Sequence, residues 1–101
     1  MAAFQLTRKA RDDLRSIGRY TQTTWGREQR SRYLSRLDAA FHALAESPEM
    51  GPACDDIREG YRKYRVGRHL IFYRQSDVGI IVVRILHERM DIAARLSESD
   101  G

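Results

Sequence analysis

The chain has 101 residues and a mass of 11.7 kDa, which is the size of one domain and excludes an enzyme with separate catalytic and cofactor domains. Its formal charge is +4, with a sequence pI near 9.6, which permits nucleic-acid binding without requiring it. The longest aliphatic run, 80–83, is far shorter than the roughly 20 apolar residues of a membrane span, and the N-terminus has no apolar signal segment. With Cys54 as the only cysteine, we expect one cytoplasmic domain over residues 1–101 and no disulfide.

A short strand is predicted at Phe4–Leu6, followed by Thr7 as the N-cap of a helix that begins near Arg8. Gly26 ends this helix. Residues of one helical face recur at spacings of three and four, and this face comprises Ala10, Leu14, Ile17, Thr21 and Trp25.

A second helix is predicted from the turn at Gly26 to Pro48, with Tyr33, Leu37, Ala40, Phe41 and Leu44 on its apolar face. The connection at Gly26 is so short that the two helices must form an antiparallel hairpin. Its shared apolar face then needs a sheet to cover it.

Strands are predicted beyond the loop at 47–56, over 60–66, 68–74 and 80–87, and the tight turns between them make an antiparallel meander. The run 79–86 is apolar at almost every position, as in a central strand covered on both faces. A short helix at 91–96 and a frayed tail at 97–101 complete the chain. The expected fold class is α+β: an N-terminal strand, and a helical hairpin packed on an antiparallel sheet with a three-stranded C-terminal meander.

Charge is distributed unevenly, since 46–57 contains four acidic residues and 58–74 contains six basic residues against Glu59. We therefore expect the positive field to be concentrated on the second half of the chain. Arginine outnumbers lysine 16 to 2, which favours a contact surface because guanidinium binds carboxylates and phosphates bidentately. A GC-rich genome, which replaces lysine codons by arginine codons, explains the same ratio.

Metal and cofactor sites are not expected, because His42, His69 and His87 lie in three different elements and Cys54 stands alone in a loop. Neither a Gly-x-Ser-x-Gly turn nor a glycine-rich phosphate loop occurs. One chemistry remains open, metal-independent RNA cleavage, which needs an acid, a base and cations. Its candidate groups are His87, Arg89, Arg62, Arg65, Arg68 and Tyr64.

Strand parity weakens that reading. Regular alternation places His87 on one face with Ile81, Val83 and Ile85, and Arg84 on the other with Ile80, Val82 and Leu86. A structural role for His87 is then a hydrogen bond to a backbone carbonyl or to a carboxylate such as Asp91. Arg84, inside an apolar strand, needs a carboxylate partner, for which Asp12, Asp13 and Glu59 are the candidates.

A set of short sequence motifs, called the family words below, resembles the ParE toxins of the RelE/ParE toxin–antitoxin superfamily in order and spacing over residues 4–96. They are Leu6-Thr7, Asp13-Leu14, Ile17, Tyr20-Thr21, Trp25-Gly26, Pro48-x-x-Gly51, Ile57-Arg58-x-Gly60-Tyr61-Arg62, Gly67-x-His69-x-Ile71-Phe72-Tyr73-Arg74 and Val83-Arg84-Ile85-Leu86-His87-x-Arg89-Met90-Asp91. Within these words a structural role is expected for Trp25, Gly60, Tyr61, His69, Arg84, His87 and Asp91, with Asp91 capping the terminal helix and bonding back to His87 or Arg89.

The resemblance implies a cytoplasmic bacterial toxin that poisons DNA gyrase, has no catalytic residue or cofactor, and is held inactive by a ParD-like antitoxin. Contact with operator DNA would come only through the antitoxin. An apolar groove along the flank of the helical hairpin and the neighbouring strand edge would take an antitoxin helix or strand. The residues expected to touch antitoxin or target are Arg58, Arg62, Arg65, Arg68, Arg89 and Arg95.

An alternative within the superfamily is a RelE-like, ribosome-dependent messenger-RNA endonuclease. Those proteins use basic sheet residues and commonly a C-terminal tyrosine, whereas the segment after His87 holds neither tyrosine nor lysine. A chain that ends at Met90 is expected to keep its fold and to lose toxicity.

Overall fold

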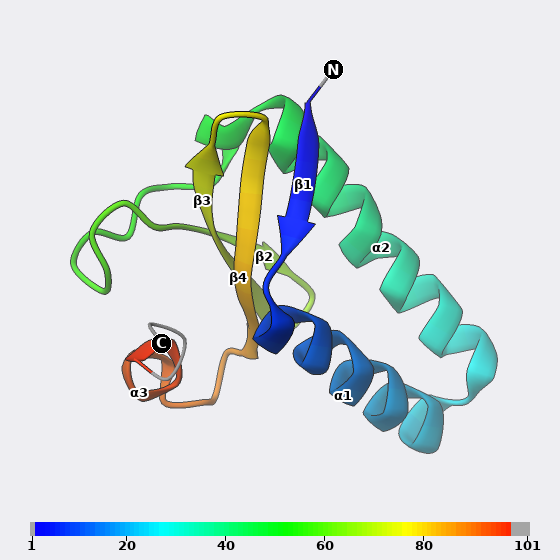
Figure 1. Ribbon diagram of the computed structural model, residues 1–101. Helices are drawn as coiled ribbons and strands as arrows, with labels where there is room; N and C mark the ends of the chain where they lie inside the picture. Colours follow the sequence, from blue (N-terminus) through cyan, green and yellow to red (C-terminus); the bar gives the residue numbers. More distant parts are fainter. Residues whose placement is uncertain (1, 98–101) are drawn as a thin grey trace.

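The computed structural model describes residues 2–97, which form a four-stranded sheet with two long helices on one side and a short helix near the C-terminus (Figure 1). The order of elements matches the sequence prediction. In chain order they are β1 (Ala3–Leu6), α1 (Arg8–Trp25), α2 (Arg27–Glu46), the 3-10 turn η1 (Pro48–Met50), β2 (Arg62–Val66), β3 (His69–Ser76), β4 (Gly79–His87) and α3 (Ile92–Ser97).

Both ends of α1 are formed as predicted. The Thr7 hydroxyl oxygen accepts the backbone N–H of Ala10 at 3.0 Å, which satisfies one of the free donors at the helix start. Gly26, with φ of 98°, ends α1, and its carbonyl accepts the N–H of Arg30 in the first turn of α2. With one residue between the helices, α1 and α2 fold back into a hairpin (Figure 1).

The strand order is β1-β4-β3-β2, and β2, β3 and β4 form the predicted antiparallel meander. The expectation of an antiparallel sheet is wrong for β1, which pairs parallel to β4 with Ala3 opposite Gly79. The reason is that the β3–β4 turn delivers the start of β4 beside the start of β1, where the Ala3 N–H reaches the Val78 carbonyl at 2.9 Å. A Cβ on Gly79 would lie 1.8 Å from the Ala3 carbonyl oxygen, so only glycine permits this approach.

The central strand β4 is covered on both faces, as its apolar run predicts. The cluster between the sheet and the helical hairpin contains Leu37, Phe41, Leu44, Ile71, Tyr73, Ile80, Val82 and Ile85. On the opposite face a smaller cluster contains Cys54, Phe72, Leu86 and Leu96. Burial of the second face therefore depends on the 53–61 loop and on α3.

A β-bulge overturns the predicted parity of β4. Phe72 pairs with Arg84 but Tyr73 pairs with Val82, so Val83 is an extra residue without a partner on β3. Ile85 consequently packs in the same cluster as Ile80 and Val82, not on the other face. The alternation assumed from sequence cannot detect an inserted residue, because it counts every position as paired.

The C-terminal helix α3 is part of the packed structure, since Leu96 is 1% exposed. Asp91 caps this helix through its carboxylate, which accepts the Ala94 N–H at 3.3 Å. Truncation after Met90 would expose Phe72 and Leu86 to water, so the expectation that such a chain keeps its fold implies a loss of stability and stays a prediction. Ser97 belongs to α3, and the remainder of the predicted frayed tail, 98–101, lies outside the described residues.

No helix within residues 2–97 is long and apolar enough to cross a membrane.

Candidate partner-binding groove

A groove of about 690 Å³ lies between the two long helices and the ends of β3 and β4. Its apolar walls include Ile17, Tyr20 and Trp25 of α1 and Met90, which follows β4. Three of these side chains are exposed although they are large and apolar: Tyr20 by 67%, Trp25 by 70% and Met90 by 44%. Such a concentration of exposed apolar surface on one concavity is typical of a site where a partner docks.

Trp25 differs from its predicted place in the core. It lies on the same helical face as buried Ala10 and Ile17, but it is the last residue of α1 and is exposed. The hairpin end of α1 is therefore free to present an aromatic side chain to the groove.

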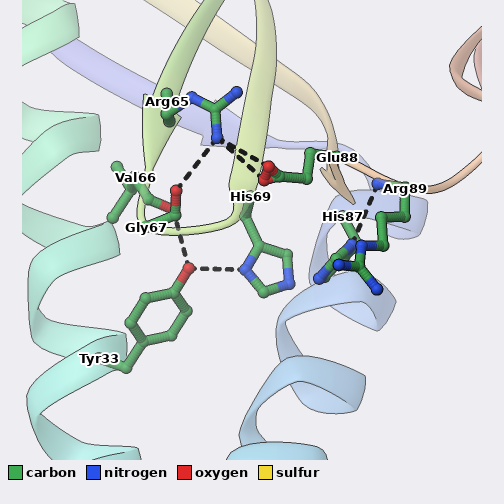
Figure 2. A network of polar contacts seen from close by, with 8 residues as sticks. All are labelled: Tyr33, Arg65, Val66, Gly67, His69, His87, Glu88 and Arg89. Atoms are coloured by element: carbon green, nitrogen blue, oxygen red, sulfur yellow. Dashed lines mark hydrogen bonds and ion pairs between the residues drawn. The ribbon is translucent and has the colours of Figure 1, made fainter.

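The floor of the groove holds a hydrogen-bonded pair, Tyr33 of α2 and His69 of β3 (Figure 2). The Tyr33 hydroxyl lies 2.8 Å from the Val66 carbonyl oxygen and 2.6 Å from Nδ1 of His69. A carbonyl can only accept, so the single hydroxyl proton goes to Val66, and the phenolic oxygen accepts from an Nδ1–H of His69. In neutral His69 the proton then resides on Nδ1, and Nε2 is an acceptor.

His87 lies directly opposite His69 on the neighbouring strand, with ring centroids 5.4 Å apart and the rings edge to face. Nδ1 of His87 accepts the backbone N–H of Arg89 at 3.1 Å (Figure 2). The predicted hydrogen bond of His87 to a carbonyl or to Asp91 is accordingly replaced by a backbone donor two residues on. In neutral His87 the proton then resides on Nε2.

Burial, reinforced by the neighbouring His87, lowers the pKa of His69 from 6.5 to about 4. Asp13 and Glu88 act in the opposite direction but more weakly. Burial likewise raises the pKa of Tyr33. Both groups of the floor are therefore uncharged near neutral pH, which suits a groove with apolar walls.

The β2–β3 turn closes one end of the groove because Gly67 adopts φ of 57° and packs against Tyr33. A Cβ at this position would lie 2.9 Å from the Tyr33 ring. Glycine is needed here both for the left-handed turn and for the contact. The family word Gly67-x-His69 thus encodes the docking of this turn on α2.

Positive charge borders the groove through Arg36 of α2 and Arg68 of the β2–β3 turn. The Arg36 guanidinium carbon lies 5.5 Å from the centre of the Tyr33 ring, within the range of a cation–π contact. Apolar walls with a cationic border favour an amphipathic, acidic segment as the occupant.

The arginines predicted to contact partners come from several different elements. The Arg62 guanidinium donates a hydrogen bond to the Gly51 carbonyl at 2.8 Å. Arg65 forms an ion pair with Glu88 at 3.1 Å (Figure 2). Among the six, Arg68 lines the groove, whereas Arg58 lies in the 54–61 loop, Arg89 follows β4 and Arg95 lies on α3.

Only some of the groups considered for RNA cleavage lie together: Arg65 pairs with Glu88, whose neighbours in the chain are His87 and Arg89. Arg68 and His87 border the groove, but Tyr64 packs against the cluster beneath the helices and Arg62 supports the loop at Gly51. Among residues 2–97, no group of three or more His, Cys, Asp and Glu side chains is placed to bind a metal ion.

Arg84 finds one of its three candidate partners, Asp13 of α1, at 2.8 Å and 2.9 Å. The same carboxylate accepts the Ile85 N–H, and the Thr7 hydroxyl donates to the Val83 carbonyl at 2.7 Å. β1 ends opposite Val82, so it offers no backbone partner to Val83 or Ile85. The side chains of Thr7 and Asp13, at the start of the first helix, bond these two backbone groups instead. The contact between the start of the first helix and β4 therefore accounts for three of the family words, Leu6-Thr7, Asp13-Leu14 and Val83-Arg84-Ile85.

Two further family words have visible structural causes. Gly60 has φ of 83° and donates its N–H to Asp55, and the adjacent Tyr61 packs against the second cluster. In Pro48-x-x-Gly51, the Tyr73 hydroxyl donates to the Pro48 carbonyl at 2.7 Å and accepts the Gly51 N–H at 2.9 Å.

Sequence reasoning missed the part of the positive charge that lies on the helical hairpin. Residues 8–36 contain nine basic and three acidic side chains, a net charge of +6, which exceeds the +5 of residues 58–74. The expected concentration in the second half is therefore wrong, and a windowed count along the whole chain would have revealed it. Tyr33 was also missed, because its spacing only marks it as apolar.

The chain is thus a small α+β protein in which a helical hairpin packs on a four-stranded sheet and borders an exposed aromatic groove. Residues 4–92 match the family described as "ParE toxin of type II toxin-antitoxin system, parDE". The chain is 43% identical to Toxin ParE1 of Mycobacterium tuberculosis over 92% of its own length and 96% of that protein. It is 35% identical to Toxin ParE of Escherichia coli, over 97% and 96% respectively. The chain belongs to the ParE toxin family.

A solved structure described as the chromosomal ParDE TA system from P. aeruginosa has the same fold, with a TM-score of 0.73 over 86% of this chain and 96% of that one. The sequence identity is 20%, so this similarity concerns the fold. The predicted family and the predicted α+β fold are both confirmed.

Proposed function

We propose that this protein is a cytoplasmic toxin that poisons DNA gyrase and is neutralised by a ParD-like antitoxin seated in the groove. Membership of the ParE family supports the toxin role. The single observation that carries the antitoxin site is the apolar groove bordered by Arg36 and Arg68. An acidic antitoxin segment would bury Tyr20, Trp25 and Met90 as it folds onto the toxin.

The gyrase target is tested by inducing the chain without antitoxin and pulse-labelling DNA and protein synthesis. We expect DNA labelling to stop first while translation continues, and purified protein to trap gyrase on cleaved DNA. An early stop in translation would contradict the gyrase target and favour the RelE-like endonuclease. Absence of both effects would contradict a toxic function for this chain.

The antitoxin site is tested by titrating the antitoxin against groove variants. Trp25→Ala and Met90→Glu each change an exposed apolar side chain of the groove wall, so each should weaken the complex about tenfold or more. The matched control is Val78→Glu, since Val78 is 55% exposed, equally apolar and outside the groove. Equal losses in the control and the groove variants would contradict this site.

A further inference from the structure

A second hollow, of about 450 Å³, lies against a different face of α1 from the groove. It is lined by Arg15, Arg19, Gln22 and Thr23 of α1 and by Arg30 of α2. Its three guanidinium groups come from two helices, so the fold of the hairpin brings them together. We call Arg15, Arg19 and Arg30 the arginine triad.

Most of the charge of the triad is not balanced inside the described part of the protein. Arg15 has an ion pair with Asp12 at 3.0 Å, but both side chains are largely exposed and the pair is weak. Arg19 and Arg30 make no ion pair within residues 2–97. Asp13, the other acid of α1, is used by Arg84. Like charges gathered in this way repel one another, so the arrangement favours an anionic ligand.

Gly18 holds one member of the triad in position. An added Cβ at Gly18 would lie 3.1 Å from Nε of Arg30 and 3.5 Å from Leu34, so the Arg30 side chain lies across α1 at the close approach of the two helices. Glycine inside a helix lowers stability by about 1 kcal/mol relative to alanine. The close approach of Arg30 explains why a glycine is present here. Packing against Gly18 restricts the Arg30 side chain, so less side-chain entropy is lost when a ligand binds.

The triad continues along α1 as a regular row. Arg11, Arg15 and Arg19 are four residues apart, which places them on one face of the helix about 6 Å apart along its axis. All three are exposed. A row of evenly spaced cations matches a polymer whose charge repeats regularly better than it matches an acidic peptide, and guanidinium binds phosphate bidentately.

We propose that the arginine triad, extended by Arg11, binds the phosphate backbone of nucleic acid directly. This departs from the expectation that DNA is reached only through the antitoxin. The contact reads no base sequence, because it consists of charge and hydrogen bonds to phosphate oxygens. It does not depend on the gyrase target, although it would hold a gyrase poison close to the DNA that gyrase cleaves.

The test is fluorescence anisotropy of the purified full chain, without antitoxin, with a labelled duplex DNA of random sequence across a salt series. The variant carries Arg15→Gln, Arg19→Gln and Arg30→Gln. Log affinity falls as log salt concentration rises, and each lost phosphate contact makes this slope less steep by about 0.9. We therefore expect the slope of the triple variant to be less steep than that of the wild type by about 2.7. The matched control, Lys9→Gln with Arg32→Gln and Arg74→Gln, loses the same charge outside the hollow and should change the slope by less than about 0.9.

Arg30 is partly buried, so the double variant Arg15→Gln with Arg19→Gln, which changes only exposed side chains, is measured alongside. Its slope should be less steep than that of the wild type by about 1.8. Equal losses in the charge-matched control, or unchanged binding in the variants, would overturn the proposal. A loss of antitoxin affinity with unchanged DNA binding would overturn it too and would assign the triad to a protein partner.

A single-stranded RNA of equal length distinguishes the source of the phosphate. Tighter binding of the duplex identifies DNA, and tighter binding of the RNA identifies a transcript or ribosomal RNA; both agree with a phosphate site. If gyrase is unaffected while the triad still governs DNA binding, the proposed gyrase target fails and the phosphate site stands.

Discussion

At the scale of single residues, the Tyr33 hydroxyl joins three elements, because it bonds the end of β2 and the start of β3 from α2. Tyr33→Phe would leave the Val66 carbonyl and the Nδ1–H of His69 without this partner. We expect a loss of about 1–3 kcal/mol in the free energy of unfolding, measured by urea denaturation. Tyr20→Phe, at an exposed position, is the control and should change stability by less than about 0.5 kcal/mol.

His69 makes stability depend on pH. Its pKa is lowered to about 4 in the folded chain, whereas in the unfolded chain it returns to 6.5. Between these values the unfolded state binds more protons, so the contribution of His69 to stability is complete above pH 6.5 and is lost as pH falls toward about 4.

The measurement is the urea midpoint across this pH range for wild type and for His69→Asn. The asparagine amide can still donate to Tyr33 but does not titrate. We expect the midpoint of the wild type to fall more steeply than that of the variant as pH decreases. Parallel curves would show that groups other than His69 account for the pH dependence.

At the scale of elements, the contact between α1 and the bulge of β4 depends on the pair Asp13–Arg84, whose side chains are 13% and 8% exposed. Asp13→Ala removes the carboxylate of a buried arginine, and we expect a loss of about 3–5 kcal/mol in denaturant unfolding. Asp12→Ala is the matched control on the same helix turn. It breaks the exposed pair with Arg15 and should cost less than about 1 kcal/mol.

The short helix α3 contributes to stability through Leu96, which covers Phe72 and Leu86. We expect Leu96→Ala to lower the free energy of unfolding by about 2–5 kcal/mol, because it opens a cavity in the smaller cluster. Ser97→Ala, exposed on the same helix, is the control. Near-equal stabilities would mean that α3 covers the sheet only loosely, and truncation after Met90 would then become a clean probe of toxicity.

At the scale of the whole molecule, the helical hairpin presents two separate surfaces, the aromatic groove and the arginine triad. Changes at sites without shared partners usually add. Trp25→Ala should therefore weaken antitoxin binding without altering the DNA salt slope, and the triad variant should do the reverse. Combining them and measuring both affinities checks this: coupling above about 0.5 kcal/mol would show that the two surfaces are one site.

Local signals in the sequence determined the elements and their order. These signals act over a few residues: the spacing of three and four in the helices, the caps Thr7 and Gly26, and the turns between apolar runs. The short connection at Gly26 then forces the two helices into a hairpin. The family words identified the toxin family, and several of them mark a specific tertiary contact, such as Gly67 on Tyr33 or Tyr73 on Gly51.

Tertiary structure alone decided the features that depend on residues far apart in the chain. The parallel pairing of β1 with β4 and the choice of Asp13 for Arg84 each join segments about 70 residues apart, and the extra residue at Val83 is visible only in the pairing of β4 with β3. The groove and the arginine triad could not be predicted from the sequence for the same reason. Periodicity identifies the face of a helix on which a side chain lies, but tertiary packing decides which neighbours cover that side chain. Trp25 is thus exposed although its helical spacing placed it on the apolar face, and Leu96 is buried although the sequence pattern gave no prediction of its burial.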